Sequence, residues 1–213
     1  MARCPSCARE QEPRLICSEC GAPLGVVLDC FTALEIPRKL QIDLDRLEHA
    51  YHELGRRIHP DRFAASPVAV RDASLRSTAL LTRSYRTIRD PVSRGLYWLE
   101  LNGEKLAENN KQVPPELAET VFEVQEQLAE LREARAAGGA DELGEQVARR
   151  RKELQASMSE AQEGLARNFA RWDAEGNASG ELTIELKSIL SKIAYLRTLI
   201  RDVDRELETA KAA

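Results

Sequence analysis

The tripeptide His59-Pro60-Asp61 places an imidazole and a carboxylate two residues apart, a pair that could exchange protons or contact a charged partner. Pro60 cannot continue a helix, because it lacks an N–H and its ring clashes with the preceding turn. His59 and Asp61 are therefore expected on an exposed turn just beyond a helix end. No nucleophile, oxyanion donor or pocket is indicated nearby, so the pattern favours a contact surface over an acid–base enzyme.

A second candidate site lies at the amino terminus, where four of the five cysteines form two CxxC pairs, Cys4 with Cys7 and Cys17 with Cys20. Each pair can wrap a turn of backbone around one ion, and two such turns complete a tetrahedral site of four thiolates. This donor set is typical of structural zinc and leaves no open position for catalysis. Because residues 1–25 can hardly bury a core of their own, the metal is expected to hold them folded.

Other uses of these cysteines are two redox dithiols, two disulfides or a mononuclear iron site. A reducing compartment disfavours disulfides, and a thioredoxin-like site would need a βαβ context that the pattern lacks. Nine residues separate the pairs, enough for a small hairpin whose turns Pro13 and Gly21 would suit. Cys30 stands alone beside Phe31 and is expected to be a buried small hydrophobe.

Composition and charge exclude several classes of protein. The 213 residues are 43 % hydrophobic, 31 % charged and 5 % aromatic, which suits a helix-rich protein of one or two domains. No apolar run approaches the roughly 18 residues of a membrane span, and no signal or transit peptide is apparent, so a cytoplasmic location is expected. Residues 31–103 carry 12 Lys/Arg against 9 Asp/Glu, and residues 104–213 carry 16 against 22. This balance argues against nucleic-acid binding and suggests two protein partners on two surfaces.

The elements that must position the tripeptide are helices. A helix capped by Asp43 or Asp45 should run to about His59, and a loop over 59–67 should follow it. A longer helix is predicted over 68–89, ending at Asp90-Pro91. A short opening helix near 31–36 and a last short helix, which contains residues 96–99 and ends at Asn102-Gly103, complete this part.

Three amphipathic helices are predicted in the carboxyl-terminal part. The first begins after Pro114-Pro115, and breaks are expected at Gly138-Gly139 and at 176–180. Short connections favour a folded-back antiparallel three-helix bundle over a long coiled coil. Phe122 and Tyr195 lie beside the apolar stripes rather than within them.

These motifs together carry a family resemblance. Tyr51, the run Ile58-His59-Pro60-Asp61-Arg62-Phe63 and Ser84-Tyr85 resemble a J-domain, and the segment 89–97 (RDPVSRGLY) resembles the HscB type of J-protein. Some members of that family carry an amino-terminal zinc module. The resemblance covers the whole chain and implies an all-α fold: a Cys4 module at 1–25, a J-domain helical hairpin at 29–103 and a three-helix antiparallel bundle at 113–210.

The resemblance also implies a first partner, an ATP-charged chaperone of the DnaK or HscA class. The J-domain would bind it and stimulate its ATPase, while this chain would bind no nucleotide and catalyse nothing itself; the sequence has no GxxxxGK[ST] loop. Arg46 and Lys39 are possible extensions of the contact surface. The expected chaperone-binding residues are His59, Pro60, Asp61, Arg56, Arg57 and Arg62.

The second implied partner is the iron–sulfur scaffold protein IscU, which the bundle would deliver to the chaperone for cluster transfer. Gln125 and Ala129 depart from the leucine and glutamate usual in the family's binding patch. Two rival functions remain: a general J-domain co-chaperone whose bundle binds other clients or dimerises, and a metal-dependent or redox enzyme using the cysteines. The positions that match the patch are Val121, Phe122, Gln125, Glu126, Ala129, Glu133 and Tyr195.

Overall fold

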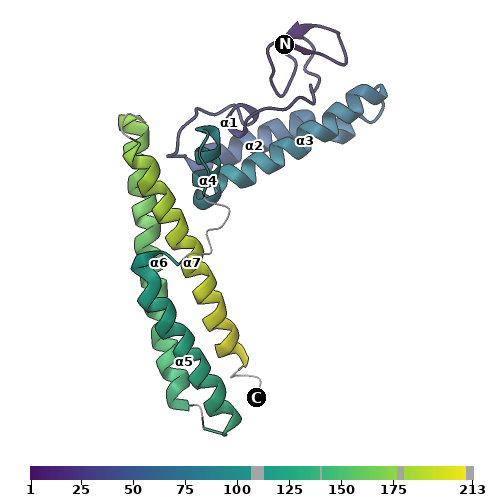
Figure 1. The fold of residues 1–213 in the computed structure, drawn as a ribbon. Helices are drawn as coiled ribbons and strands as arrows, with labels where there is room; N and C mark the ends of the chain where they lie inside the picture. Colours follow the sequence, from purple (N-terminus) through teal and green to yellow (C-terminus); the bar gives the residue numbers. More distant parts are fainter. Residues whose placement is uncertain (107–112, 140, 177–179, 210–213) are drawn as a thin grey trace. The chain divides into compact units, whose positions relative to one another are not determined.

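The computed structural model describes residues 1–106, 113–139, 141–176 and 180–209, and the chain forms two compact units, Met1–Trp98 and Leu99–Ala213 (Figure 1). Apart from two short strands and an isolated bridge in the amino-terminal module, the regular structure of these residues is helical, so the all-α class is confirmed. None of the described helices combines the length and apolarity needed to cross a bilayer.

The first unit contains the predicted helices around the tripeptide. Asp43 begins the long helix before it by accepting the N–H groups of Asp45 and Arg46, and Pro60 ends that helix at Ile58 as predicted. Tyr51 stacks on Tyr85 with ring centroids 4.2 Å apart, which joins the two long helices. The elements are α1 (Cys30–Ala33), α2 (Leu44–Ile58), the 3-10 helix η1 (Pro60–Phe63), α3 (Val68–Arg89) and α4 (Pro91–Leu101).

The segment that resembles the HscB type forms a structural corner. Asp90 accepts the Ser93 N–H over 2.7 Å at the start of α4. The buried Arg94 donates to the Ile88 carbonyl over 2.6 Å, which satisfies a backbone acceptor in the last turn of α3. The Tyr97 hydroxyl accepts the Cys30 N–H over 2.9 Å and so ties α4 to α1. These residues therefore set the geometry of the unit.

Asp29 caps α1 and carries a perturbed carboxyl group. It accepts the Phe31 and Thr32 N–H groups over 3.0 and 3.1 Å and the Thr32 hydroxyl over 2.6 Å, and Arg38 lies 3.6 Å away. Burial of the carboxylate raises its pKa, but the Thr32 hydrogen bonds and the Arg38 charge outweigh burial, so the pKa of Asp29 is lowered.

Replacing this cap with alanine should lower the free energy of unfolding by about 1 kcal/mol at pH 7. Because the folded pKa lies below the unfolded one, the charge stabilises the fold above about pH 4. That contribution is lost as the pH falls through the folded pKa. Urea unfolding of Asp29→Ala and Asp29→Asn from pH 7 downward checks this, since asparagine keeps the cap without the charge. Equal stability of Asp29→Asn and the wild type at every pH would show that the charge contributes nothing.

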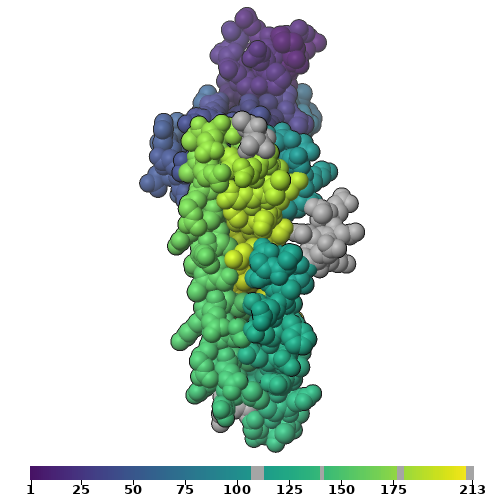
Figure 2. All heavy atoms as spheres, turned by 60° about the vertical axis from the view of Figure 1, so that its left-hand side comes forward, coloured from purple at the N-terminus to yellow at the C-terminus, as the bar shows by residue number. Residues whose placement is uncertain are grey.

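The second unit is a bundle of three helices that pack side by side (Figure 2). After the 3-10 helix η2 (Pro115–Leu117), the helices are α5 (Ala118–Ala136), α6 (Asp141–Glu175) and α7 (Glu181–Thr209). The break at Gly138-Gly139 is confirmed, whereas residues 177–179 of the second predicted break and residue 210 of the predicted domain lie outside the described residues. Leu128, Leu131, Leu154, Leu186, Ile193 and Leu196 are among its buried core residues.

The register between α5 and α7 shows over what length the bundle contains all three helices. Arg132 and Arg135 both contact Glu206, and Arg135 also donates to Thr209, 74 residues further along the chain. The two helices run parallel, and α6 runs antiparallel to both (Figure 1). At this offset Ala118 lies level with Lys192, so residues 181–191 of α7 extend beyond α5. The predicted three-helix bundle is confirmed, with unequal helix lengths.

Candidate functional site: a four-cysteine cluster, the HPD turn and an exposed bundle face

The two CxxC pairs fold into equivalent turns. The Ala8 N–H donates to the Cys4 carbonyl over 3.0 Å, and the Gly21 N–H donates to the Cys17 carbonyl over 3.1 Å. The residue after each pair is left-handed, with φ of 59° at Ala8 and 72° at Gly21. Glycine adopts this conformation freely, whereas alanine at the first turn carries a strain of about 1–2 kcal/mol. Both turns were predicted from the CxxC spacing, whereas the left-handed conformation of Ala8 was not.

The strands of this module lie elsewhere than expected. Strand β1 (Ala2–Arg3) pairs with β2 (Glu10–Gln11), so the hairpin encloses the first CxxC pair instead of lying between the pairs. A bridge between Ile16 and Pro23 encloses the second pair in the same way. The expectation of one hairpin between the pairs was wrong, because each pair has flanking residues that pair with one another.

The four sulfurs are arranged as one ion would need them. Cys4 Sγ lies 3.6 Å from Cys20 Sγ, Cys7 Sγ lies 3.8 Å from Cys17 Sγ, and all four lie within 4.8 Å of one another. A tetrahedron with metal–sulfur bonds of about 2.3 Å has edges of about 3.8 Å. The cysteines are free, and these distances far exceed a disulfide bond of about 2.05 Å. The residues present therefore fit a tetrahedral metal ion.

Polar groups around Cys17 stabilise its thiolate form. Burial of the thiol opposes ionisation, but the N–H groups of Cys20 and Glu19 and the Gln11 amide outweigh it and lower the pKa of Cys17 to about 6. Gln11 Nε2 lies 3.0 Å from Cys17 Sγ, and its oxygen accepts the Ser18 N–H over 3.1 Å, which fixes the amide. Sequence analysis missed Gln11, because nothing in the CxxC spacing points to it.

The HPD turn, which we define as residues 59–66, is closed by two hydrogen bonds that His59 accepts. The Asp61 N–H donates to His59 Nδ1 over 3.3 Å, and the Arg62 N–H donates to the His59 carbonyl over 3.0 Å. The Asp61 carboxylate Oδ2 lies 3.4 Å from the same ring nitrogen. Half-buried Pro60 follows at the first position of η1, where its missing N–H costs nothing.

This geometry leaves the Asp61 carboxylate available for a partner. Its side chain is 90 % exposed, against 55 % for His59. The Arg62 guanidinium donates to the Arg56 carbonyl over 3.2 Å and is thereby held beside the last turn of α2. Arg56 and Arg57 are exposed in that turn, and Arg56 lies 3.7 Å from the exposed Glu53.

Arg46 and Lys39, which were expected to extend the basic surface, are also exposed. Arg46 lies about three turns before Arg57 on the same face of α2. Together with Lys39 it lines a hollow of ≈ 660 Å³, whose apolar lining includes Ile36, Ile42 and Leu47. Arg46 therefore faces the same way as Arg57, while Lys39 belongs to the loop before α2.

The residues matched to the scaffold patch gather on the outer face of α5. Phe122, Gln125, Glu126, Ala129 and Glu133 are exposed and recur at helical spacing, whereas the core stripe of this helix is buried. Phe122 is 69 % exposed, which is unusual for so large an apolar side chain. Packing within the bundle therefore does not account for a phenylalanine at this position.

Val121 of α5 and Tyr195 of α7 are both half-buried. The offset of 74 residues between α5 and α7 sets Tyr195 level with Val121. The residues expected on two helices are thus brought to one height of the bundle.

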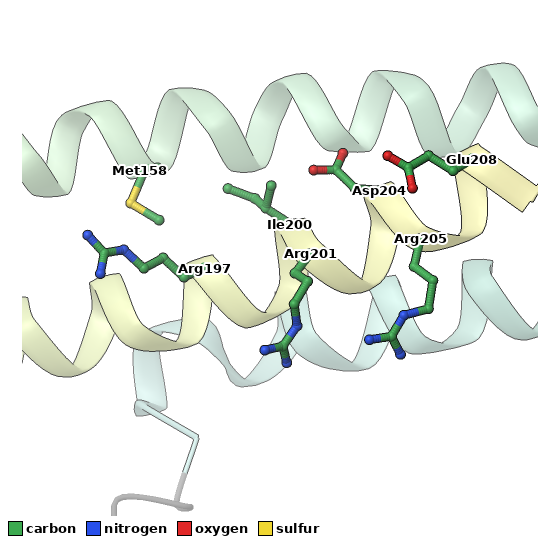
Figure 3. A pocket seen from close by; sticks show the side chains of 7 residues that line it. All are labelled: Met158, Arg197, Ile200, Arg201, Asp204, Arg205 and Glu208. Carbon is green, nitrogen blue, oxygen red and sulfur yellow. The ribbon is translucent and has the colours of Figure 1, made fainter.

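Another hollow, of ≈ 410 Å³, lies between α6 and α7 and contains none of the expected scaffold residues. Arg201 and Arg205 extend away from Asp204 and Glu208, which lie toward α6 (Figure 3). Asp204 is already paired with Arg151. Because both signs of charge line this hollow and one acid is neutralised, it does not select a charged ligand.

The comparisons with known proteins agree with these features. No protein-family model matches the chain. The "Co-chaperone protein HscB homolog" of Azoarcus sp. (strain BH72) is 36 % identical over 181 residues, which cover 84 % of this chain and 94 % of that protein. The "Iron-sulfur cluster co-chaperone protein HscB" of Homo sapiens is 28 % identical over 192 residues, covering 89 % of this chain and 74 % of that protein.

A solved structure extends the comparison to the fold. The crystal structure of human co-chaperone protein HscB aligns with a TM-score of 0.71 at 23 % identity and covers 95 % of this chain and 96 % of its own. The chain belongs to the HscB co-chaperone family. The resemblance identified from the tripeptide, the 89–97 segment and the cysteines is therefore confirmed.

Proposed function

We propose that this protein is a J-domain co-chaperone of iron–sulfur cluster biogenesis that stimulates the ATPase of a DnaK- or HscA-class chaperone. The observation that carries this proposal is the 90 % exposed Asp61 carboxylate in a turn that directly follows the exposed Arg56 and Arg57 of α2. The carboxylate would pair with an arginine or a backbone N–H of the chaperone. Arg56, Arg57 and Arg62 would face acidic groups. Stimulation follows if this contact favours the hydrolysis-competent conformation of the chaperone.

We further propose that the exposed face of α5, together with Tyr195, binds an IscU-type scaffold. An exposed phenylalanine beside acidic residues suits a partner that offers an apolar pocket with cationic groups around it. Holding the scaffold and the chaperone on one chain raises the concentration of each near the other without any new contact between them. Tethering of this kind is sufficient to couple the two binding events.

In this proposal the four-cysteine cluster holds one structural zinc ion, and the protein works in the reducing cytoplasm. Zinc suits four thiolates in a closed tetrahedron and has no redox chemistry of its own. When bound, it would hold residues 1–25 folded. Cys4, Cys7, Cys17 and Cys20 would ligate it, and the Gln11 amide would orient Cys17.

Single-turnover ATP hydrolysis by the cognate chaperone tests the central proposal, with this protein added alone and together with scaffold. We expect stimulation by this protein and further stimulation when scaffold is present. Stimulation without any effect of scaffold would favour a general J-domain co-chaperone with other clients. An ATPase rate unchanged by this protein would overturn the proposal.

Truncating Phe122 to alanine should weaken scaffold binding by about tenfold or more, because buried aromatic anchors at interfaces typically contribute about 2 kcal/mol or more. Calorimetric titration of scaffold into the wild type and Phe122→Ala measures this.

Ile184→Ala provides the matched control for Phe122→Ala. Ile184 is 72 % exposed on α7 in the part that extends beyond α5, so its truncation also removes exposed apolar surface. Scaffold binding should be unchanged in this variant. Equal affinities for Phe122→Ala and Ile184→Ala would count against the α5 face as the binding site.

A further inference from the structure

The amino-terminal module shares a core with the start of α3. Its buried residues Cys4, Cys17 and Leu24 form one apolar cluster with Val70, and Phe63 packs against this cluster. Val70 lies in the first turn of α3, and Phe63 is the last residue of η1. The side chains that cover the cysteines on this side therefore come from the HPD turn and from the helix that follows it.

A close backbone contact at Gly25 fixes the module on α3. A Cβ at position 25 would lie 2.7 Å from Ala73 Cα, and the residue has φ of +62°. The Gly25 N–H donates to the Ser77 hydroxyl over 3.1 Å, and its carbonyl accepts from Arg76 over 3.2 Å. Only glycine allows an approach this close, so the connection is a packed joint rather than a loose linker.

The same part of α3 also contacts the residue that directly precedes the HPD turn. The Ser74 hydroxyl donates to the Ile58 carbonyl over 2.6 Å, and the Thr78 hydroxyl lies 3.5 Å from the same oxygen. Ile58 directly precedes His59 at the end of α2. One stretch of α3 thus contacts the module through Val70 and Ser77 and the base of the turn through Ser74.

We propose that the metal-loaded module braces the HPD turn, so that metal binding sets how well the turn is ordered for the chaperone. This inference rests on the proposed function, since it needs both the metal and the chaperone contact. Without a metal, residues 1–25 have too little apolar surface to hold their fold. Phe63 and Val70 then lose their packing contacts with the module, and the HPD turn samples conformations that do not bind the chaperone. Gly25, Val70 and Phe63 act as positioning residues.

Amide hydrogen exchange on the full-length protein tests the brace, with Zn²⁺ bound and after removal by a chelator. The reporters are the amides of Arg62, Ala64 and Ser66, whose hydrogen bonds to His59, Asp61 and Phe63 close the turn. We expect their exchange to quicken at least about fivefold when zinc is removed, while amides of α5 stay unchanged. The concentration of co-chaperone that gives half-maximal ATPase stimulation should rise by a similar factor, with the maximal rate largely retained.

Gly25→Ala separates the brace from metal binding, because it keeps all four cysteines but forces the joint apart. Its turn amides should exchange quickly even with zinc bound. Gly103→Ala is the matched control, since Gly103 has φ of +74° but nothing within 4 Å of an added Cβ. Arg76→Ala, which removes only the hydrogen bond to the Gly25 carbonyl, should give a smaller change in the same direction.

The outcomes distinguish the two levels of the proposal. In one outcome, removing zinc speeds amide exchange in residues 1–25 but leaves the exchange of the turn amides unchanged. This outcome overturns the brace while the metal site stands. If the purified protein binds no zinc at all, the metal site and the brace fall together. Quickened exchange in Gly103→Ala equal to that in Gly25→Ala would also overturn the brace.

Discussion

Replacing Asp61 by asparagine should abolish ATPase stimulation at co-chaperone concentrations that suffice for the wild type, while leaving the fold and scaffold binding intact. Asparagine has the same shape and the side chain is 90 % exposed, so the turn loses no packing. What it loses is a charge-assisted contact with the chaperone, and removing one member of a hydrogen-bonded charge pair at an interface costs about 2–5 kcal/mol. The co-chaperone concentration for half-maximal stimulation should therefore rise at least about thirtyfold. Single-turnover hydrolysis at increasing co-chaperone concentration measures this.

Asp72→Asn makes the same chemical change at an exposed position of α3 outside the HPD turn. It changes the net charge equally, so any general electrostatic effect should appear in both variants. Stimulation should survive in Asp72→Asn and fail in Asp61→Asn. Full stimulation by Asp61→Asn would remove the main support for a chaperone contact through this turn.

The helices of the first unit were predictable because local signals determine their ends. Pro60 has no N–H to donate, Asp43 can satisfy the free amides of a first helical turn, and Asp90-Pro91 cannot prolong α3. The structure places α2 at Leu44–Ile58 and α3 at Val68–Arg89, in agreement with these signals. The identities of the four cysteines and their convergence followed from spacing in the same way.

The contacts of the cysteine module were not predictable from spacing. Gly25 packs on Ala73, and Gln11 orients Cys17, through surfaces that no local periodicity encodes. Glycine in a short connecting segment normally indicates a turn, and only the folded chain shows that this one is needed for a close approach. The left-handed Ala8 is similar, because its conformation follows from the CxxC turn and not from its residue type.

The bundle illustrates a different limit. Apolar stripes predicted three helices, but periodicity does not fix the register between them, which follows from contacts such as Arg135 with Glu206. That register brings Val121 and Tyr195 to one level and leaves the start of α7 beyond α5. The exposure of Phe122 agrees with its position beside the predicted stripe, since a residue off the stripe is directed away from the core.

Replacing Cys17 by serine should remove the metal and unfold the amino-terminal module. Changes to groups that merely orient a ligand typically cost 10–100-fold in metal affinity, so loss of a thiolate should cost more than about 100-fold. Gln11→Ala, which removes only the hydrogen bond to Cys17, should cost about tenfold. Affinity is measured by competition with a chromogenic zinc chelator, and Co²⁺ substitution reports the tetrahedral thiolate site through its visible absorption.

Cys30→Ala is the matched control, because Cys30 is a buried cysteine of the same unit that lies outside the four-sulfur cluster. Its zinc affinity should equal that of the wild type, with one ion per chain. The expected order of zinc affinity is wild type equal to Cys30→Ala, then Gln11→Ala, then Cys17→Ser. A reducible bond in place of the ion, or zinc retained by Cys17→Ser, would mean that the cysteines serve another purpose. Zinc held by the wild type and by Cys30→Ala but lost from Cys17→Ser would thus separate a structural ion from a redox pair, which needs no ion.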